Sequence, residues 1–169
     1  LSSLEVMEQI IRKDAVIKVI PYGTITKEQS GRGSLSAMDE IAGRVASFSD
    51  DGKGVQDEAL MRQAMIKAAA LDRVITAHCE NEAYPAKDAR SEWTEAVRDI
   101  QLTEETGAAL HICHVSSART LEAVREAKAR GVNVTCETAP HYIAFSEEDV
   151  TDDGKFKMNP PIRSERDKA

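Results

Sequence analysis

Hydrophobic residues recur along the chain with two periods, one typical of helices and one typical of strands. Spacings of three and four residues predict an opening helix, helices over 36–42, 57–71 and 91–106, and a helix that Ser117 caps and that ends at Gly131. Short runs of β-branched and apolar residues predict five strands, over 15–20, 45–48, 74–77, 110–113 and 132–136. On the helix over 91–106, the stripe expected to face the core consists of Trp93, Val97 and Ile100.

The order of these elements, with strand alternating with helix, indicates an α/β fold built on parallel strands. Two architectures fit such a series. One is a complete, doubly wound open sheet, and the other is part of an eight-stranded (β/α)8 TIM-type barrel, which typically needs ~250 residues. The hydrophobic pattern fits both, so the placement of polar residues has to separate them.

Composition narrows the class of protein. Of the 169 residues, 41% are hydrophobic and 30% are charged, without low-complexity tracts, so the chain can bury a core. No apolar run approaches the ~20 residues of a membrane-spanning helix. The net charge of −7 argues against nucleic acid or an anionic membrane surface as the partner. Cys79, Cys113 and Cys136 lack CxxC spacing, so we expect reduced thiols in a cytoplasmic protein.

Both ends of the chain are abrupt. It starts at Leu1, without an initiator Met, directly in a helical pattern, and it stops at Ala169 just after a new element begins. Neither end resembles a signal peptide or a tapering tail. We therefore expect the sequence to be an excerpt of a larger protein.

Acidic and imidazole side chains follow consecutive predicted strands. The residues at these C-terminal strand ends are Asp50 and Asp51, His78, His114 and His141. Asp51, His78, His114 and His141 are separated by 27, 36 and 27 residues, and each step is one strand-helix unit. In a closed barrel such ends converge on one axis, whereas in an open sheet they spread along an edge with strands ~4.8 Å apart. The pattern therefore favours the barrel.

Two neutral imidazoles and a carboxylate from separate strands suit Zn²⁺, with open positions for water and substrate. A single His at a strand end is more often an ordinary hydrogen-bonded residue, so the metal hypothesis rests on the joint pattern. His111 and His114 are three apart on a strand and are expected on opposite faces. Cys79 and Cys113 each adjoin a candidate ligand, so we expect both to face the helices as small buried hydrophobes.

Five motifs occur in a fixed order along the chain. They are Phe48-Ser49-Asp50-Asp51-Gly52, Ala77-His78-Cys79-Glu80, His111-Ile112-Cys113-His114-Val115-Ser116, Thr138-Ala139-Pro140-His141 and Lys157-Met158-Asn159-Pro160-Pro161-Ile162-Arg163. Together they resemble the bacterial class I dihydroorotases of the amidohydrolase superfamily, and the resemblance covers essentially the whole chain.

The resemblance implies a (β/α)8 barrel with a two-zinc centre that interconverts L-dihydroorotate and N-carbamoyl-L-aspartate in pyrimidine biosynthesis. It implies that Asp51 bridges the two zincs, and the spacing to His78 supports this choice over Asp50. His78 and His114 match the imidazole ligands of the second zinc, and Asn159 matches a substrate-contacting residue. His141 matches a motif position to which the resemblance attaches no ligand role.

The family's first-strand His-x-His-x-Arg and the last-strand aspartate, which serves as ligand and acid/base, do not occur in this chain. Residues 1–169 are therefore expected to be the central part of a single barrel domain, about strands three to seven, truncated at both ends. Such a piece contains no catalytic acid/base and is expected to be inactive alone. The stretch between His78 and His114 is shorter than in many relatives.

Three alternatives stay open. The first is another cyclic amidohydrolase of the hydantoinase or allantoinase type, which uses a carboxylated lysine as the bridge; here Lys53 lies beyond a glycine, off the strand. The second is a non-catalytic dihydroorotase-like scaffold for aspartate transcarbamoylase. The third is a flavodoxin-like binding domain, disfavoured because no Gly-rich phosphate loop follows the first strand. As assemblies, the resemblance allows a homodimer or a complex with aspartate transcarbamoylase.

Overall fold

Strands and helices alternate through the middle of the chain, as the hydrophobic pattern predicts. The computed structural model describes residues 2–168. Its elements are α1 (Ser2–Asp14), α2 (Met38–Ile41), β1 (Ser47–Phe48), α3 (Glu58–Ala70), β2 (Val74–Ala77), α4 (Arg90–Thr106), β3 (Ala109–Ile112), α5 (Ala118–Ala129), β4 (Val134–Cys136) and α6 (Pro140–Ala144). No helix within residues 2–168 combines the length and apolar character needed to cross a membrane.

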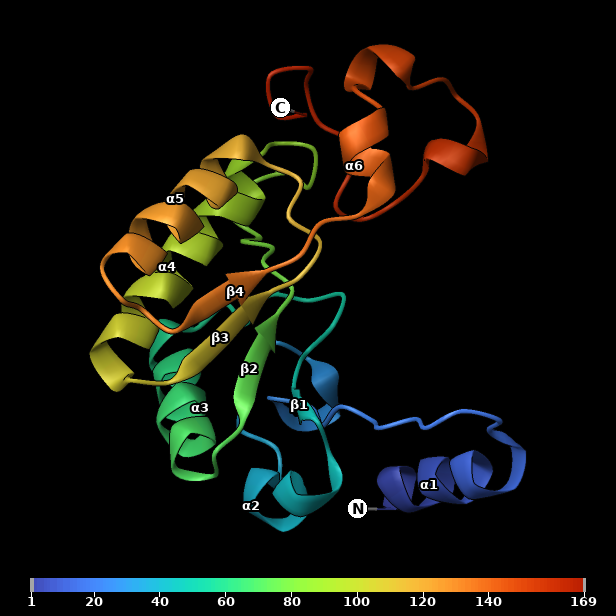
Figure 1. Cartoon of the computed structure of the whole chain (residues 1–169), viewed down its shortest axis with the longest axis vertical. Helices are drawn as coiled ribbons and strands as arrows, with labels where there is room; N and C mark the ends of the chain where they lie inside the picture. The colour runs from blue at the N-terminus through green and yellow to red at the C-terminus, as the bar shows by residue number, and fades with distance from the viewer. Residues whose placement is uncertain (1, 169) are drawn as a thin grey trace.

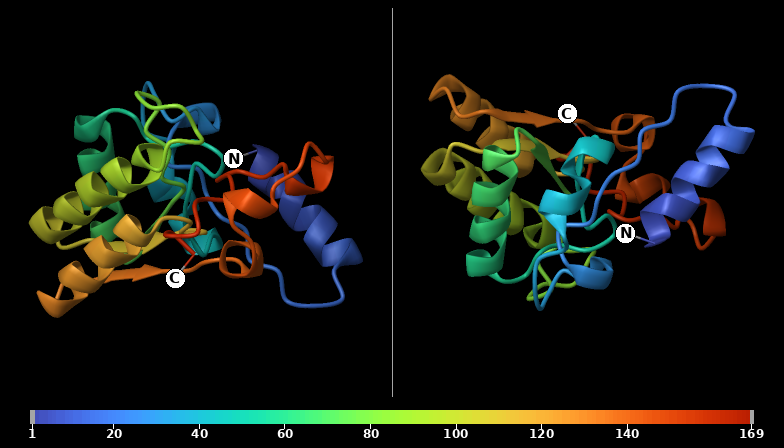
Figure 2. Two further views of the ribbon diagram at one scale, coloured as in Figure 1. Left: turned by 90° about the horizontal axis from the view of Figure 1, so that it is seen from above. Right: turned by 90° about the horizontal axis from the view of Figure 1, so that it is seen from below.

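The strand order of the sheet and the face that the helices cover distinguish a (β/α)8 barrel from a doubly wound sheet. Within residues 2–168 it has four parallel strands in the order β1-β2-β3-β4, with Ser47 opposite Val74 and Val74 opposite Ala109. Helices α3, α4 and α5 all lie on one face of this sheet (Figure 1), and α4 lies beside α5 in both views of Figure 2. A doubly wound sheet would reverse its strand order and carry helices on both faces. The chain therefore forms part of a (β/α)8 barrel, which confirms the predicted fold class.

Local signals at the helix ends match the sequence. The Asp57 side chain accepts a hydrogen bond from the backbone N–H of Leu60 at 2.9 Å and so caps α3. Gly107 ends α4 with a left-handed φ of 70°, a conformation that glycine adopts without steric cost. Ser117 stands at the N-cap position of α5 as predicted, but the predicted cap by its side chain is wrong, because its hydroxyl makes no hydrogen bond among the described residues.

The core fills the space between the sheet and the three helices. Its largest fully buried apolar side chains come from β1, β2, β3, α3 and α4 and from the α2 region: Phe48, Ile25, Met38, Met61, Met65, Ile75, Leu102, Leu110 and Ile112. These residues stabilise the element arrangement through burial of apolar surface. The polar ends of the strands are thereby held at one edge of a packed layer.

The strand predicted over 15–20 is wrong. Val16 is 97% exposed and Ile17 is 74% exposed, and neither lies in a strand. Pairing beside β1 begins only at Pro21, whose carbonyl accepts from Ala46 N at 2.9 Å, and it continues where Gly23 N donates to Ser47 O at 3.0 Å. A β-branched run becomes a strand only where a neighbouring backbone pairs with it.

The predicted core stripe of α4 is also wrong in two of its three positions. Ile100 is buried as expected, but Val97 is 36% exposed and Trp93 is only half-buried. The helix instead turns carboxylates toward the interior. These are Glu92, Glu95 and Asp99, exposed by 2%, 2% and 0%. Hydrophobic spacing missed this face because the donors to Glu92 come from the distant segment after β3. Arg98 of the same helix pairs with Glu95 and Asp99.

Candidate metal centre

Three neighbouring strands each deliver one potential ligand to the same place. Asp51 follows β1, His78 follows β2 directly, and His114 follows β3. Their ligand atoms all lie within 4.8 Å of one another. Because the strands are parallel and adjacent, residues 27 and 36 positions apart in sequence become neighbours in space. The structure thus brings together the three predicted ligands.

The two histidines of this group touch directly. His78 Nδ1 and His114 Nε2 are 2.9 Å apart, and the rings meet edge to face with centroids 4.7 Å apart. His114 Nδ1 is buried and has no hydrogen-bond partner among the described residues. Burial lowers the pKa of His114, and the adjacent His78 ring lowers it further. The His114 ring is therefore suited to be a neutral nitrogen ligand.

His114 reaches the site through a local break in the strand. Its φ is +38°, in the left-handed region, so the side-chain alternation of β3 does not continue through it. Cys113 consequently does not face the helices as predicted, but lines a cavity with Asp51 and Thr76. The matching prediction for Cys79 is confirmed, because that thiol is buried in the core.

Cys113 also belongs to a second group of potential ligands, with His111 and Glu137, whose ligand atoms lie within 4.8 Å of one another. His111 Nδ1 hydrogen-bonds with Thr135 Oγ1 at 2.8 Å. Burial raises the pKa of the Cys113 thiol to about 12, and the Glu137 carboxylate adds to that increase. A free thiol at this position is therefore protonated at neutral pH.

The two adjacent aspartates have different surroundings. Asp50 is 1% exposed, and its carboxylate accepts hydrogen bonds from the backbone N–H groups of Ile25 at 2.8 Å, Thr26 at 3.1 Å and Gly31 at 3.3 Å. These contacts close the loop that precedes α2. Asp51 is exposed and belongs to the ligand group. Geometry therefore leaves Asp51, and not Asp50, free to bind an ion.

Glu80 is a site residue that the sequence reasoning missed. Its Oε2 lies 2.9 Å from His78 Nε2 and accepts a hydrogen bond from Asn159 Nδ2 at 2.8 Å. Burial alone raises the pKa of Glu80, but the hydrogen bonds from His78 and Asn159 lower it by more in sum. Its spacing of two from His78 was the available signal, because residues i and i+2 of an extended segment share a face.

The predicted substrate-contacting Asn159 lies at this site, whereas His141 does not. Asn159 Nδ2 is 3.4 Å from His78 Nε2, although 81 residues separate the two in sequence. His141 lies in α6, where its ring packs 4.1 Å from the ring of Tyr142. The roles of Asp51, His78, His114 and Asn159 stay predictions.

Helix α4 contacts two loops of the site through the side chain of Glu95. Glu95 Oε2 accepts from Glu80 N at 3.0 Å, and the same carboxylate packs against Gly54 in the loop after β1. Burial and the nearby Asp99 carboxylate raise the pKa of Glu95 to about 8, although Arg98 opposes the shift. One buried side chain thus joins the loops that follow β1 and β2.

The donor set fits a divalent metal. It offers one carboxylate and two imidazoles, the oxygen and nitrogen ligands that catalytic zinc sites use. The ring nitrogens of His78 and His114 face each other, and His114 Nδ1 is buried without a partner in the described chain. A cation bound between the two rings would accept these nitrogen lone pairs.

Comparison with known proteins gives the chain a context. A family model described as Dihydro-orotase-like matches residues 2–94. The dihydroorotase of Fusobacterium nucleatum is 42% identical, with 95% of this chain and 42% of that protein covered. The dihydroorotase of Brevibacillus brevis is 38% identical, with 100% of this chain and 45% of that protein covered. The chain thus spans less than half the length of these curated relatives.

Solved structures share the fold. The L-hydantoinase (dihydropyrimidinase) from Arthrobacter aurescens superposes with a TM-score of 0.78 at 21% identity, over 99% of this chain and 42% of that one. Dihydroorotase from Saccharomyces cerevisiae, solved in complex with 5-fluoroorotic acid, has a TM-score of 0.76 at 13% identity, over 99% of this chain and 52% of that one. At these identities the likeness shows the fold alone.

Proposed function

The chain belongs to the dihydro-orotase-like family, and from this premise we propose that it is the central part of a dihydroorotase. On this proposal residues 1–169 supply about strands three to seven of a single (β/α)8 barrel domain. The whole enzyme hydrolyses the cyclic amide L-dihydroorotate to N-carbamoyl-L-aspartate and catalyses the reverse cyclisation in pyrimidine biosynthesis. The convergence of Asp51, His78 and His114 at the ends of three adjacent strands is the observation that carries this proposal.

We assign the metal as zinc, in a two-metal centre. Asp51 would bridge the two ions, and His78 and His114 would hold one of them. When bound, zinc polarises a carbonyl group and lowers the pKa of a coordinated water. The nitrogen and oxygen donors of this chain suit zinc, and the remaining ligands belong to barrel strands outside this sequence.

The chain's own residues orient the site. Glu80 hydrogen-bonds His78 and so fixes the direction of its ring, as outer carboxylates do for metal-bound histidines. Asn159 Nδ2 lies beside His78, where its N–H groups can donate to a polar atom of the substrate. The acid/base that moves a proton to the leaving nitrogen lies outside this chain, so no catalytic residue is assigned here.

We also propose a cellular compartment, a class of substrate and two candidate assemblies. The three cysteines are all free, which supports a reducing compartment, and we place the protein in the cytoplasm. Its substrate is a small molecule. A homodimer and a complex with aspartate transcarbamoylase are the two assemblies to test by light scattering with and without that enzyme.

The test combines metal content with substrate choice in the complete protein. We expect zinc by elemental analysis and turnover of L-dihydroorotate, and we expect His114→Asn to lose both. His141→Asn is the matched control, since His141 lies outside the ligand group, and it should retain zinc. A complete protein without zinc would favour the scaffold and overturn the proposal. Preferential turnover of a hydantoin or of allantoin would reassign the substrate.

A further inference from the structure

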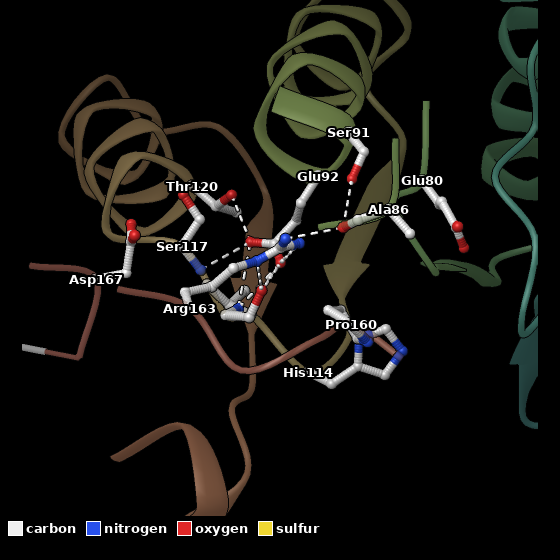
Figure 3. Close-up of polar contacts among 12 residues, drawn as sticks. Glu80, Ala86, Ser91, Glu92, His114, Ser117, Thr120, Pro160, Arg163 and Asp167 are labelled. Atoms are coloured by element: carbon white, nitrogen blue, oxygen red, sulfur yellow. Dashed lines mark hydrogen bonds and ion pairs between the residues drawn. The ribbon is translucent and has the colours of Figure 1, made fainter. Parts of the chain in front are cut away.

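A buried cluster joins three segments that are far apart in sequence. It consists of Glu92 on α4, Ser116 in the loop after β3, and Arg163 near the C-terminal end of the chain. Figure 3 shows Glu92 and Arg163 side by side, next to Ser117 and Thr120. We call Glu92, Ser116 and Arg163 the Glu92 cluster. Their exposures are 2%, 5% and 6%, so the cluster is enclosed by protein. None of the three is in the ligand group of the metal centre.

Glu92 binds the start of the chain that follows β3. Its carboxylate accepts from the backbone N–H groups of Ser116 at 3.1 Å and Ser117 at 3.1 Å, and from Thr120 Oγ1 at 2.7 Å. The Ser116 hydroxyl donates to the same carboxylate. These donors lie at the N-terminus of α5, where a negative charge is favourable. Glu92 thus supplies the cap that the Ser117 hydroxyl does not make.

Arg163 ties the C-terminal segment to the same point. Its Nε donates to Ser116 Oγ at 3.0 Å, and its Nη1 donates to the carbonyl oxygen of Ala86 at 2.8 Å. Its Nη2 lies 4.0 Å from Glu92 Oε2, which pairs the two buried charges. The Ser116 hydroxyl therefore donates to one member of the ion pair and accepts from the other. Its loss would remove a hydrogen bond from both Glu92 and Arg163.

Each end of the cluster is close in sequence to a site residue. Ser116 stands two residues after His114, whose left-handed backbone needs support from its neighbours. Arg163 stands four residues after Asn159, and the intervening Pro160 and Pro161 restrict the backbone between them. A displacement of Ser116 or Arg163 is therefore expected to shift the backbone of His114 and Asn159 as well.

We propose that Glu92, Ser116 and Arg163 are positioning residues that hold Asn159 and His114 in register with each other. Asn159 is the substrate-contacting residue and His114 a metal ligand, so this inference rests on the proposed function. Through the cluster, the segment that contacts substrate is fixed relative to the strand end that binds metal. None of the three residues touches the reacting atoms.

Adjacent serines provide a matched pair of variants. Ser116→Ala removes the shared hydroxyl. Ser117→Ala removes a hydroxyl that is equally buried but has no hydrogen-bond partner among the described residues. Both variants lose one oxygen atom from the same loop, so a general effect of truncation is common to both.

The first measurement is independent of activity. The side-chain amide signals of Asn159 in a ¹⁵N–¹H NMR spectrum, assigned with Asn159→Asp, report its hydrogen bond to Glu80. Ser116→Ala should shift these signals and speed their exchange with solvent, and Ser117→Ala should leave both unchanged. Arg163→Lys should act like Ser116→Ala, because a lysine cannot reach Ser116 and Ala86 together.

The second measurement is made on the complete, zinc-loaded protein with L-dihydroorotate. Ser116→Ala should raise KM by up to about tenfold, because a displaced Asn159 loses a hydrogen bond to the substrate, and Ser117→Ala should not. A loss of stability alone would lower the amount of active protein and leave KM unchanged. Folded Ser116→Ala and Arg163→Lys proteins with the Asn159 signals and the KM of Ser117→Ala would overturn the inference. Absence of dihydroorotate turnover in the wild type would count against the proposed function, while the NMR result would still decide the role of the cluster.

Discussion

Asp50 and Asp51 follow β1, and the structure assigns them different roles: Asp50 holds a loop by hydrogen bonds, and Asp51 belongs to the ligand group. Asp50→Asn replaces one buried carboxylate oxygen with an NH₂ group. Wherever that group points, it faces a donor, because Ile25 N lies against one oxygen and the Thr26 hydroxyl and Gly31 N lie against the other. The variant should therefore unfold more easily, with folded protein still able to bind zinc.

The magnitude follows from the contacts. Hydrogen bonds to a charged group contribute about 1.5–3 kcal/mol each, and the amide keeps some of them, so Asp50→Asn should lower the free energy of unfolding by about 2–4 kcal/mol. Asp51 is exposed, so Asp51→Asn should change that free energy by less than about 0.5 kcal/mol without metal. Asp51→Asn should instead lose zinc.

Urea unfolding followed by circular dichroism in EDTA measures the stability of each variant, and calorimetric titration with zinc measures binding. Equal destabilisation by the two variants would refute the division of roles. Loss of zinc from folded Asp50→Asn, with retention in Asp51→Asn, would reverse the assignment of the ligand.

Three further predictions concern the interior. The folded-state pKa of Glu95, raised to about 8 by burial and by the Asp99 carboxylate, exceeds its ordinary value of 4.5. The folded protein therefore holds a proton that the unfolded chain releases, and the stabilisation present below pH 4.5 is lost as the pH rises toward 8. The free energy of unfolding should fall by about 1.4 kcal/mol per pH unit relative to Glu95→Gln in that window, and parallel curves for the two proteins would contradict this. Gly54→Ala should lower stability by about 1–3 kcal/mol in thermal melts, since its Cβ would clash with the buried Glu95 carboxylate. Gly43→Ala is its control, because nothing lies within 4 Å of that added carbon, and equal melting shifts would disprove the clash. Cys79 is buried, and burial raises the pKa of its thiol, so a thiol reagent at pH 7 should modify it only on unfolding; rapid labelling of native protein, seen by mass spectrometry, would be inconsistent with its packing.

The sequence by itself determined the element order and the candidate ligands. The strand over 74–77 and the helix capped by Asp57 match the structure closely, because their signals are local: apolar runs, a capping side chain and glycine stops. The sequence could predict Asp51, His78 and His114 as ligands because residues at the ends of adjacent parallel strands meet at one edge.

Only the tertiary structure decided what depends on contacts between distant segments. The β-branched run over 15–20 has a strand's composition but no pairing neighbour within residues 2–168, and pairing with β1 begins at Pro21. Because the backbone is left-handed at His114, side-chain alternation stops there, and Cys113 lines the cavity beside Asp51 instead of facing the helices. Glu92 is polar by type yet buried, because its donors lie 24 to 28 residues away in sequence. Spacing along a chain records which residues are apolar, whereas the donors that allow a charge to be buried are assembled only by the fold.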